Sequence, residues 1–514
     1  RPPGRHSGEP SLGVHSMGPS ASRSYMCCAV RDKDGGESYG LGKVPQFSCI
    51  DTEAPLLEEA CFLSYSPLYQ QEASKPRRLA VASAKEVCIY RLPEPMDDGP
   101  SALSKLTLSH RLRLEEDRRV SALLFCEEDS SRHVAVAFRP SGKAAAATTS
   151  RFAAHIVKIF SCDATGPMPG STGEAPSTVV DWTFEKGCDS TLEGHTDVIV
   201  KLAANRAYLV SADLSGQVCA WQKGQWQKSK PLQRKASVLC HAGGIADLSV
   251  DRSFAYTVSR EENRVCIWSL PELTQVLSLP IDLTEDLLNG LTPPLPPPQA
   301  LVLATTHQVA AATAATAAET VAAPAGPAVG PLQSRIARVN LVRRPLSRWA
   351  GSPGITTKGG LPGRKTPRGC LFVAAILGGG CEVAGLGAGV LTEWNLGDRP
   401  GLTGVQIAHD TPIVSLVYGP YDNGPLITAD MRGVFRVWEF SLDRGLQLSQ
   451  QIVIQSQSPA AGLVTSADDW SRFMSPACAG WPAVAVEPPR AVYVIVSGRL
   501  FIWQRQLDAS HGPV

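Results

Sequence analysis

The sequence predicts an all-β chain in which one unit of short antiparallel strands is repeated. The first observation is that residues 195–221 and residues 409–438 follow the same pattern. Each unit begins with His, continues with Ile and Leu at a fixed spacing, and runs through an apolar stretch into Ser/Thr-Ala-Asp. Gly follows that Asp by three residues and Trp follows it by eight. The second observation is a shorter closing pattern, apolar-x-x-aromatic after a turn, which occurs seven times.

The first unit divides into three strands and a tight turn. The segments 199–202, 208–211 and 218–221 have the length and alternation of short strands with one buried face. Between the last two strands, the residues Asp213 to Gly216 supply a turn in which Gly can adopt a positive φ. Such a unit cannot bury its apolar face alone, so its repetition predicts stacked neighbouring sheets.

These units resemble WD40 repeats, which build β-propellers from four-stranded blades. The resemblance implies a structural tetrad in each complete unit, in which a carboxylate accepts from an imidazole, the imidazole reaches a hydroxyl, and the hydroxyl accepts from an indole N–H. The residues that match this tetrad are His195, Ser211, Asp213 and Trp221 in the first unit and His409, Thr428, Asp430 and Trp438 in the second.

A third unit keeps only part of the pattern. His241 and Trp268 stand at the expected ends, but the turn between residues 259 and 263 contains neither the Asp nor the Gly. Asn263 tolerates the left-handed region, so we expect the turn to survive and the tetrad to be incomplete.

The seven closing patterns predict a single seven-bladed β-propeller of four-stranded antiparallel blades over residues 44–508. The closing aromatic residues are Tyr90, Phe160, Trp221, Trp268, Trp394, Trp438 and Trp503. WD40 propellers usually close with the N-terminal strand completing the last blade, so the resemblance implies that residues 44–50 supply that strand and leave no edge open to aggregation. Residues 1–43 are rich in Gly, Ser and Pro and are predicted to be a disordered tail.

A long insertion is predicted around blade five. The closing residues Trp268 and Trp394 are 126 positions apart, whereas one repeat needs about 40–45 residues. The excess falls in residues 280–370, which are Pro- and Ala-rich and then basic. Both 301–306 and 336–342 fit the first strand of blade five, and the sequence does not choose between them.

The basic part of this insertion is a candidate contact surface. Residues 320–381 contain no acidic residue. The cations that we regard as candidates for partner binding are Arg335, Arg338, Arg343, Arg344, Arg348, Arg364, Lys365 and Arg368. Two interpretations stay open: a solvated flexible loop, or an electrostatic contact with RNA or an acidic partner.

Composition narrows the function classes. The formal net charge is +1, so the whole chain has no strong field that would attract nucleic acid or membranes. Although there are 14 cysteines, no Cys-x2-Cys occurs, and Cys88, Cys219 and Cys266 share one repeat position typical of packing residues. This usage favours a cytoplasmic or nuclear location. The apolar stretch 371–391 contains six glycines, which favours two strands and a turn over a membrane span.

No catalytic motif is recognisable, so we expect neither an enzyme nor a cofactor or metal site. The leading hypothesis is a scaffold for protein–protein interaction. An RNA-associated propeller that uses the basic insertion, and a substrate receptor of an associated enzyme, are the alternatives. In WD40 proteins partners dock where the His loops and Asp turns emerge, which points to Asp197 and Thr411. The alanines at positions 212 and 429 offer little contact area, which favours binding through inserted loops.

Overall fold

The computed structural model comprises two compact units, Arg1–Pro45 and Gln46–Val514. Every regular element among its described residues is a β-strand. The residues that it describes are 25–31, 37–43, 47–51, 62–65, 77–92, 106–114, 117–127, 132–141, 155–162, 179–184, 187–223, 232–259, 262, 264–281, 300–304, 334–342, 370–377, 389–396, 400–411, 413–418, 426–430, 433–441, 445–455, 483–487, 491–496 and 499–505.

The N-terminal unit contains a two-stranded antiparallel ribbon. Strand β1 (Tyr25–Arg31) pairs with β2 (Glu37–Lys43) along its whole length. The prediction that residues 1–43 are disordered is therefore wrong for these two segments. The reason lies in local composition: β1 has the sequence YMCCAVR, an apolar strand-forming run inside a Gly- and Ser-rich region.

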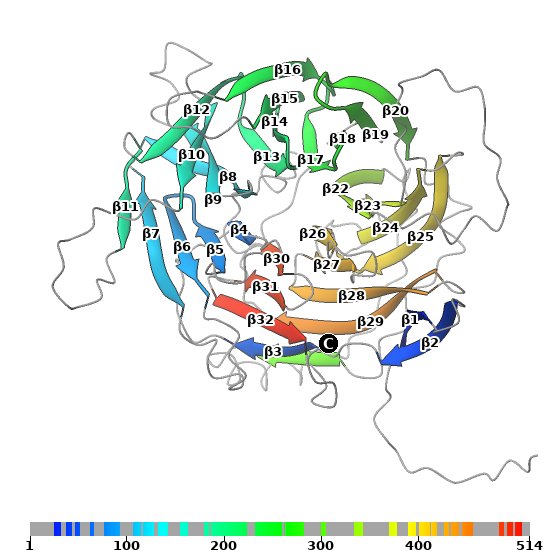
Figure 1. Ribbon diagram of the computed structural model, residues 1–514. Coiled ribbons are helices and arrows are strands. Elements are labelled where there is room, and N and C mark those ends of the chain that lie inside the picture. The colour runs from blue at the N-terminus through cyan, green and yellow to red at the C-terminus, as the bar shows by residue number, and fades with distance from the viewer. Residues whose placement is uncertain are drawn as a thin grey trace, which may run out of the picture. The chain divides into compact units, whose positions relative to one another are not determined.

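The second unit is built from seven sheets of four or five described strands. We number the sheets in chain order and give the strands of each from the centre outward, as Figure 1 shows them. The first sheet contains β4 (Phe62–Tyr65), β5 (Arg78–Ala82), β6 (Glu86–Arg91), β7 (Thr107–Arg113) and β11 (Val180–Trp182). The second contains β8 (Arg118–Glu127), β9 (Arg132–Pro140), β10 (His155–Ser161) and β12 (Cys188–His195). The third contains β13 (Ile199–Ala204), β14 (Tyr208–Asp213), β15 (Gln217–Gln222) and β16 (Gln233–Leu239).

The fourth sheet contains β17 (Ile245–Val250), β18 (Phe254–Ser259), β19 (Arg264–Ser269) and β20 (Thr274–Pro280). The fifth contains β22 (Ser334–Val342), β23 (Cys370–Leu377), β24 (Gly389–Asn395) and β25 (Gly401–His409). The sixth contains β26 (Ile413–Tyr418), β27 (Leu426–Asp430), β28 (Val434–Ser441), β29 (Gly445–Gln455) and β21 (Ala300–Ala304). The seventh contains β30 (Ala483–Glu487), β31 (Ala491–Val496), β32 (Arg499–Arg505) and β3 (Phe47–Asp51).

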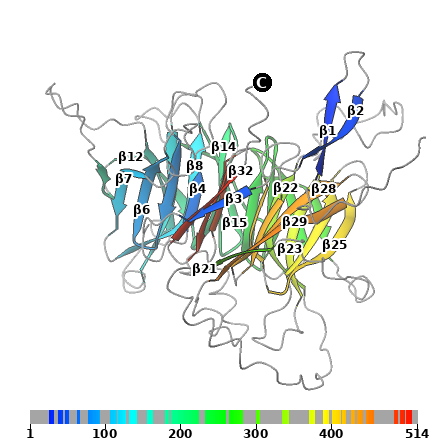
Figure 2. The ribbon, with the colours of Figure 1, turned by 90° about the horizontal axis from the view of Figure 1, so that it is seen from below.

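The sheets of this unit are arranged radially, with their innermost strands around a common centre (Figure 1). Contacts between innermost strands run in the order β4, β8, β13, β17, β22, β26 and β30, and β30 contacts β4 in turn. Figure 2 shows the same sheets from the side. This arrangement is characteristic of a β-propeller. The prediction of an all-β chain of stacked antiparallel sheets is confirmed.

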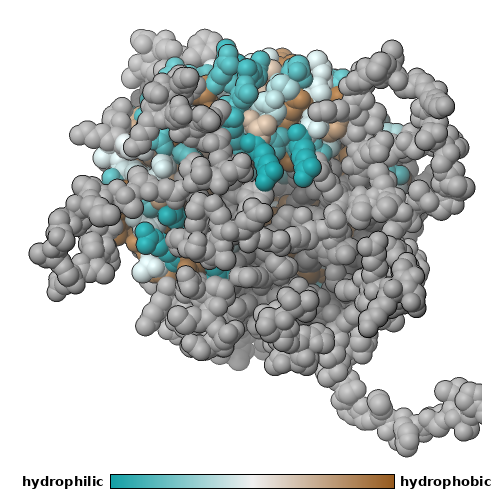
Figure 3. All heavy atoms as spheres, viewed as in Figure 1, coloured by the Kyte–Doolittle hydropathy of each residue, from teal (hydrophilic) through white to brown (hydrophobic). Residues whose placement is uncertain are grey.

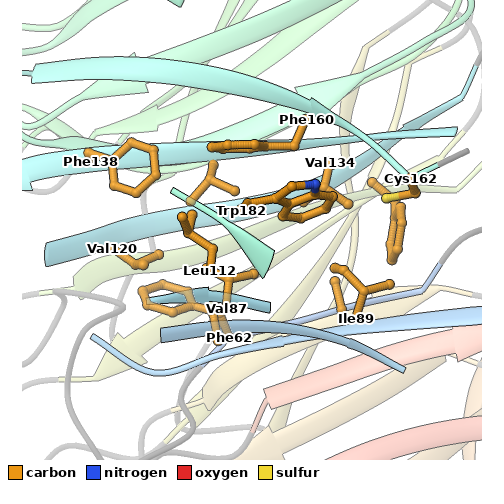
Figure 4. Close-up of a cluster of buried hydrophobic side chains, with 14 of the residues drawn as sticks. Phe62, Val87, Ile89, Leu112, Val120, Val134, Phe138, Phe160, Cys162 and Trp182 are labelled. Carbon is orange, nitrogen blue, oxygen red and sulfur yellow. The ribbon is translucent and has the colours of Figure 1, made fainter. Parts of the chain in front are cut away.

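Hydrophobic side chains fill the spaces between successive sheets. One buried cluster joins the first and second sheets and includes Val87, Leu112, Val134, Phe138 and Phe160 (Figure 4). Comparable clusters join the second sheet to the third, the third to the fourth, the fourth to the fifth, and the fifth to the sixth. Burial on both faces explains why β5 is apolar from Leu79 to Ala82.

Three outermost strands come from distant positions in the chain, namely β3, β11 and β21. Strand β3 pairs antiparallel with β32, so the N-terminal strand of this unit lies beside the C-terminal one. Strand β21 pairs in parallel with β29 in the sixth sheet, whereas β22 pairs with β23 in the fifth. Of the two segments that fit the first strand of blade five, the structure therefore places only 334–342 there.

The two ends of the apolar stretch 371–391 belong to β23 and β24, as predicted, and the predicted turn between them falls outside the described residues. Among the described residues, no helix is long and apolar enough to cross a membrane.

Candidate functional site

A chain of buried hydrogen bonds links the second and third sheets. His195 ends β12, and its Nδ1 lies 2.9 Å from Oδ2 of Asp213 at the end of β14. On the other side of the ring, Nε2 lies 2.6 Å from Oγ of Ser211, which accepts from Nε1 of Trp221 at 2.9 Å. All four side chains are buried. Each buried polar group thus has a partner, which avoids the cost of desolvating it alone.

The second carboxylate oxygen of Asp213 holds the following turn. Its Oδ1 accepts from the backbone N–H of Gln217 at 2.9 Å and from Oγ of Ser215 at 2.7 Å. Gly216 has a φ of +95°, and a Cβ there would collide with the backbone oxygen of His241. Position 216, the last residue of this turn, is therefore restricted to Gly by both conformation and space.

The second complete unit has the same connections between the fifth and sixth sheets. His409 ends β25, with Nδ1 3.3 Å from Oδ2 of Asp430 and Nε2 2.6 Å from Oγ1 of Thr428. Trp438 donates to that hydroxyl at 2.8 Å, and the backbone N–H of Val434 donates to Oδ1 of Asp430 at 2.9 Å. The two units therefore match in their hydrogen bonds as well as in their sequence pattern.

The third unit is complete in the structure, which contradicts the expectation that His241 and Trp268 form only part of a tetrad. His241 lies 3.1 Å from Oε2 of Glu262 through Nδ1 and 2.8 Å from Oγ1 of Thr257 through Nε2. Trp268 donates to the same hydroxyl at 2.8 Å. Oε1 of Glu262 accepts from the N–H of Ala242 at 2.8 Å. A glutamate thus takes the place of the aspartate.

The sequence indicated the hydroxyl residue of this unit through its spacing but not the acidic residue. Thr257 follows His241 by 16 residues, the same separation as between His195 and Ser211, so spacing alone identifies it. Glu262 lies beyond the position expected for the acid, and its backbone N–H donates to Oγ of Ser259 at 2.9 Å. In this turn the acidic residue comes later in the sequence than the aspartate of the other units. The additional methylene of Glu lets the carboxylate of Glu262 still reach the ring of His241.

The histidines differ in their protonation. Burial is the largest single influence on His195 and would lower its pKa, but the hydrogen bonds and charges of Asp213 and Cys219 together outweigh it and raise the pKa to about 9. Burial lowers the pKa of His241, and the hydrogen bond to the partly exposed Glu262 does not compensate. The imidazole in the third sheet's network is therefore charged at neutral pH, and the one in the fourth sheet's network is neutral.

The buried histidine of each network is followed in the sequence by an exposed residue. The position directly after the buried histidine is exposed in all three units, at Thr196, Ala242 and Asp410. We call these three residues the rim. They lie where β12, β16 and β25 turn into the next sheet, at the same ends of the sheets as the carboxylate turns. In the view of Figure 3 the visible described surface over β13–β20 is mostly hydrophilic.

The two predicted contact residues lie one position beyond the rim. Asp197 is half-buried, and its Oδ1 accepts from the N–H of Val198 at 2.6 Å. Thr411 is only 1% exposed, so its prediction as a partner contact is wrong. It packs in the narrow space beside Gly389, whose backbone it approaches closely. The alternation of the loop turns Asp410 outward instead.

The basic insertion lies almost entirely outside the described residues. Arg335 and Arg338 belong to β22, the innermost strand of the fifth sheet. The candidates that fall outside are Arg343, Arg344, Arg348, Arg364, Lys365 and Arg368. The predicted basic surface as a whole therefore falls outside the described residues.

Titratable residues elsewhere in the described ranges show no arrangement that suggests a metal site, since no group of three metal-ligating side chains occurs there. The described cysteines Cys88, Cys219 and Cys266 are unpaired and buried, and burial raises the pKa of the Cys88 thiol to about 11. The chemistry of the networks is that of hydrogen-bonded support for loops.

Comparison with known proteins adds little to this description. No family model and no curated protein matches the chain. A chain in a solved structure entitled "Crystal Structure of Mitotic Checkpoint Complex" is similar at 12% sequence identity and a TM-score of 0.47. The match covers 90% of this chain and 95% of that chain. A likeness at this level identifies neither a family nor a function.

Proposed function

We propose that the chain is a non-enzymatic, seven-bladed β-propeller of the WD40 type that acts as a scaffold for protein–protein interaction. The observation that carries this proposal is the threefold recurrence of a buried His–carboxylate–hydroxyl–indole network below an exposed rim residue. In each unit the polar chemistry is directed inward and holds a loop in place. The contacts among all the innermost strands, and the pairing of β3 with β32, support a closed ring.

Rigid loops favour binding because less conformational entropy is lost when a partner orders them. In the third sheet, the carboxylate of Asp213 fixes the turn to Gln217 while its histidine fixes the start of the next loop. The fourth sheet achieves the same result through Glu262, which holds the N–H of Ala242. Three such loops present the rim on one end of the sheets, and we propose this end as the partner-binding face.

The test is to change the rim without touching the networks. The variant carries Thr196→Arg, Ala242→Arg and Asp410→Arg, and its bound proteins are identified by affinity purification and mass spectrometry. We expect a reproducible set of partners to be lost while the melting temperature stays unchanged.

The matched control carries Ala207→Arg and Arg252→Asp, which lie in the β13–β14 and β17–β18 turns at the opposite ends of the strands. It should retain the full set of partners. If rim and control variants lose the same partners, or if neither loses any, the assignment of the binding face is wrong. Weaker binding at high salt in both would favour a charged surface elsewhere, such as the basic insertion.

A further inference from the structure

The outer strands share a feature that divides each of them into two parts. In six sheets the pairing of the third and fourth strands shifts by one residue at the closing aromatic residue, which marks a β-bulge in the outer strand. In β16 the extra residue is Lys235, because Ala220 pairs with Ala236 and Trp221 pairs with Arg234. The part of the outer strand after the bulge leads to the face that carries the rim.

Two sheets bind an additional strand, and both do so only after the bulge. Strand β11 pairs in parallel with residues 110–112 of β7, directly after the bulge residue Ser109. Strand β21 pairs in parallel with residues 451–455 of β29, beyond the bulge residue Ser449. The protein therefore shows twice, from unrelated parts of its sequence, that this edge accepts an extended segment in parallel orientation.

The side chains of β11 show how such a segment is held. Trp182 is 5% exposed and stacks on Phe160, with ring centroids 5.0 Å apart. Figure 4 shows it lying between Phe160 and Leu112. Asp181 stands opposite Arg111 in the register. An apolar anchor and a carboxylate opposite a cation thus accompany the backbone pairing.

The corresponding edge of the third sheet pairs with no strand among the described residues. After its bulge, β16 consists of residues 236–239, Ala-Ser-Val-Leu, without any charge. Leu239 is 65% exposed, the highest exposure of any large hydrophobic side chain in the described ranges. Before this segment, Arg234 and Lys235 are both exposed. Charged side chains protect only the first part of this edge from pairing with another chain. The uncharged part that follows lacks this protection, and an exposed apolar edge readily pairs.

The hydrogen bonds inside the third sheet show which donors of this edge point outward. The N–H of Cys240 donates inward to the oxygen of Gly216 at 2.8 Å. Because N–H groups alternate along a strand, those of Leu239 and Ser237 point away from β15. The fourth sheet offers a poorer edge, since β20 ends in Pro280, which has no N–H.

We propose that the outer edge of β16 over residues 236–239 binds an extended segment of a partner protein in parallel orientation. In parallel pairing the N-terminal end of the bound segment lies near Arg234 and Lys235, so it carries acidic residues there. Alternating aliphatic residues follow and cover Leu239. The inference names a second surface and a class of partner for the proposed scaffold, and in that sense rests on it.

The test uses a fluorescent peptide with two acidic residues followed by the sequence of β21, Asp-Glu-Ala-Leu-Val-Leu-Ala. Binding to the full chain is measured by anisotropy. Ser237→Pro removes one outward N–H, and Pro is tolerated in edge strands where that donor faces solvent. Ser237→Ala is the matched control, because it removes the same hydroxyl, which contacts Gln217 and Cys219, but keeps the N–H. We expect Ser237→Pro to weaken binding by about tenfold and Ser237→Ala by less than about twofold.

Hydrogen exchange provides a measurement that does not depend on how the proline variant folds. In the unaltered chain the peptide should slow the exchange of residues 237–239 and leave the rim residue Asp410 unaffected. Equal affinity of the proline and alanine variants, or no protection at residues 237–239, would overturn the proposal. A peptide-independent dimer that only Ser237→Pro abolishes would overturn it too, in favour of a second copy at this edge. None of these results bears on the rim, which the arginine variants test separately.

Discussion

At the scale of single residues, the reach of an acidic side chain decides which turn can hold a buried histidine. Asp213 and Asp430 approach their histidines from the end of a strand. Glu262 does so from farther along a turn that Ser259 stabilises. A search for Asp at one register therefore finds two networks and misses the third. Such a substitution follows from local backbone geometry, which sequence spacing alone does not reveal.

Removal of the carboxylates should rank the three networks. We expect Asp213→Ala and Asp430→Ala each to lower the free energy of unfolding by about 1–3 kcal/mol, because buried donors lose their acceptor. Glu262→Ala should cost less than either, since its carboxylate is partly exposed and water can replace it. Urea unfolding measures the order, with Glu261→Ala as the neighbouring control. Equal losses in all four variants would show that the networks do not stabilise the fold.

The histidines should give opposite dependences on pH. The pKa of His195 is raised to about 9 in the folded state, so its protonated form stabilises the fold at or below the unfolded value of 6.5, and this contribution is lost as the pH rises toward 9. The pKa of His241 is lowered, so its contribution is present above 6.5 and is lost as the pH falls. We therefore expect the destabilisation caused by His195→Gln to shrink with increasing pH and that caused by His241→Gln to grow. Parallel profiles in urea unfolding across this range would contradict the assignment.

At the scale of the elements, the sequence predicts the inner three strands of a sheet better than the outer one. All seven closing aromatic residues lie on the third strand of a sheet. Where their burial is described, those strands are mostly buried on both faces and therefore carry a strong pattern. Six of the seven fourth strands bear a bulge, most of them have a solvated edge, and their patterns are weaker. The place of β21 was not predictable for a different reason. An added parallel strand has no neighbour in the sequence that fixes the strand with which it pairs.

Strand β3 should protect the edge of the seventh sheet. A chain that begins at Thr52 lacks β3 and leaves β32 without its outer partner. We expect it to melt at a lower temperature and to associate at high concentration, because an unpaired edge strand binds other edges. A chain that begins at Gln46 retains β3 and is the matched control. Monomeric behaviour and equal melting temperatures of the two chains, measured by scattering and calorimetry, would remove this role from β3.

At the scale of the whole molecule, the packing of neighbouring sheets explains how the chain accommodates long insertions. Each sheet packs mainly against the sheets before and after it, so loops that leave the sheets do not disturb the core between them. The all-β class and the recurrence of antiparallel sheets were predictable from the sequence because the core has one pattern. The course of the insertions was not, because their composition imposes no buried face. One part of the insertion does join a sheet, because strand β21 pairs with β29 in the sixth sheet.

The insertion between the fourth and fifth sheets should therefore be dispensable except where it forms β21. We expect replacement of residues 306–331 by a Gly/Ser link of about 14 residues to change the melting temperature by no more than about 2 °C, since halving a loop alters its closure free energy by only about 0.6 kcal/mol. A link of this length reaches at most about 46–50 Å when extended. Replacement of residues 300–331 by the same link also removes β21, which uncovers residues 451–455 of β29. That variant should unfold at a lower temperature and associate, as calorimetry and light scattering would show. If the shorter replacement destabilises the fold as much as the longer one, the insertion supports the ring through residues other than β21.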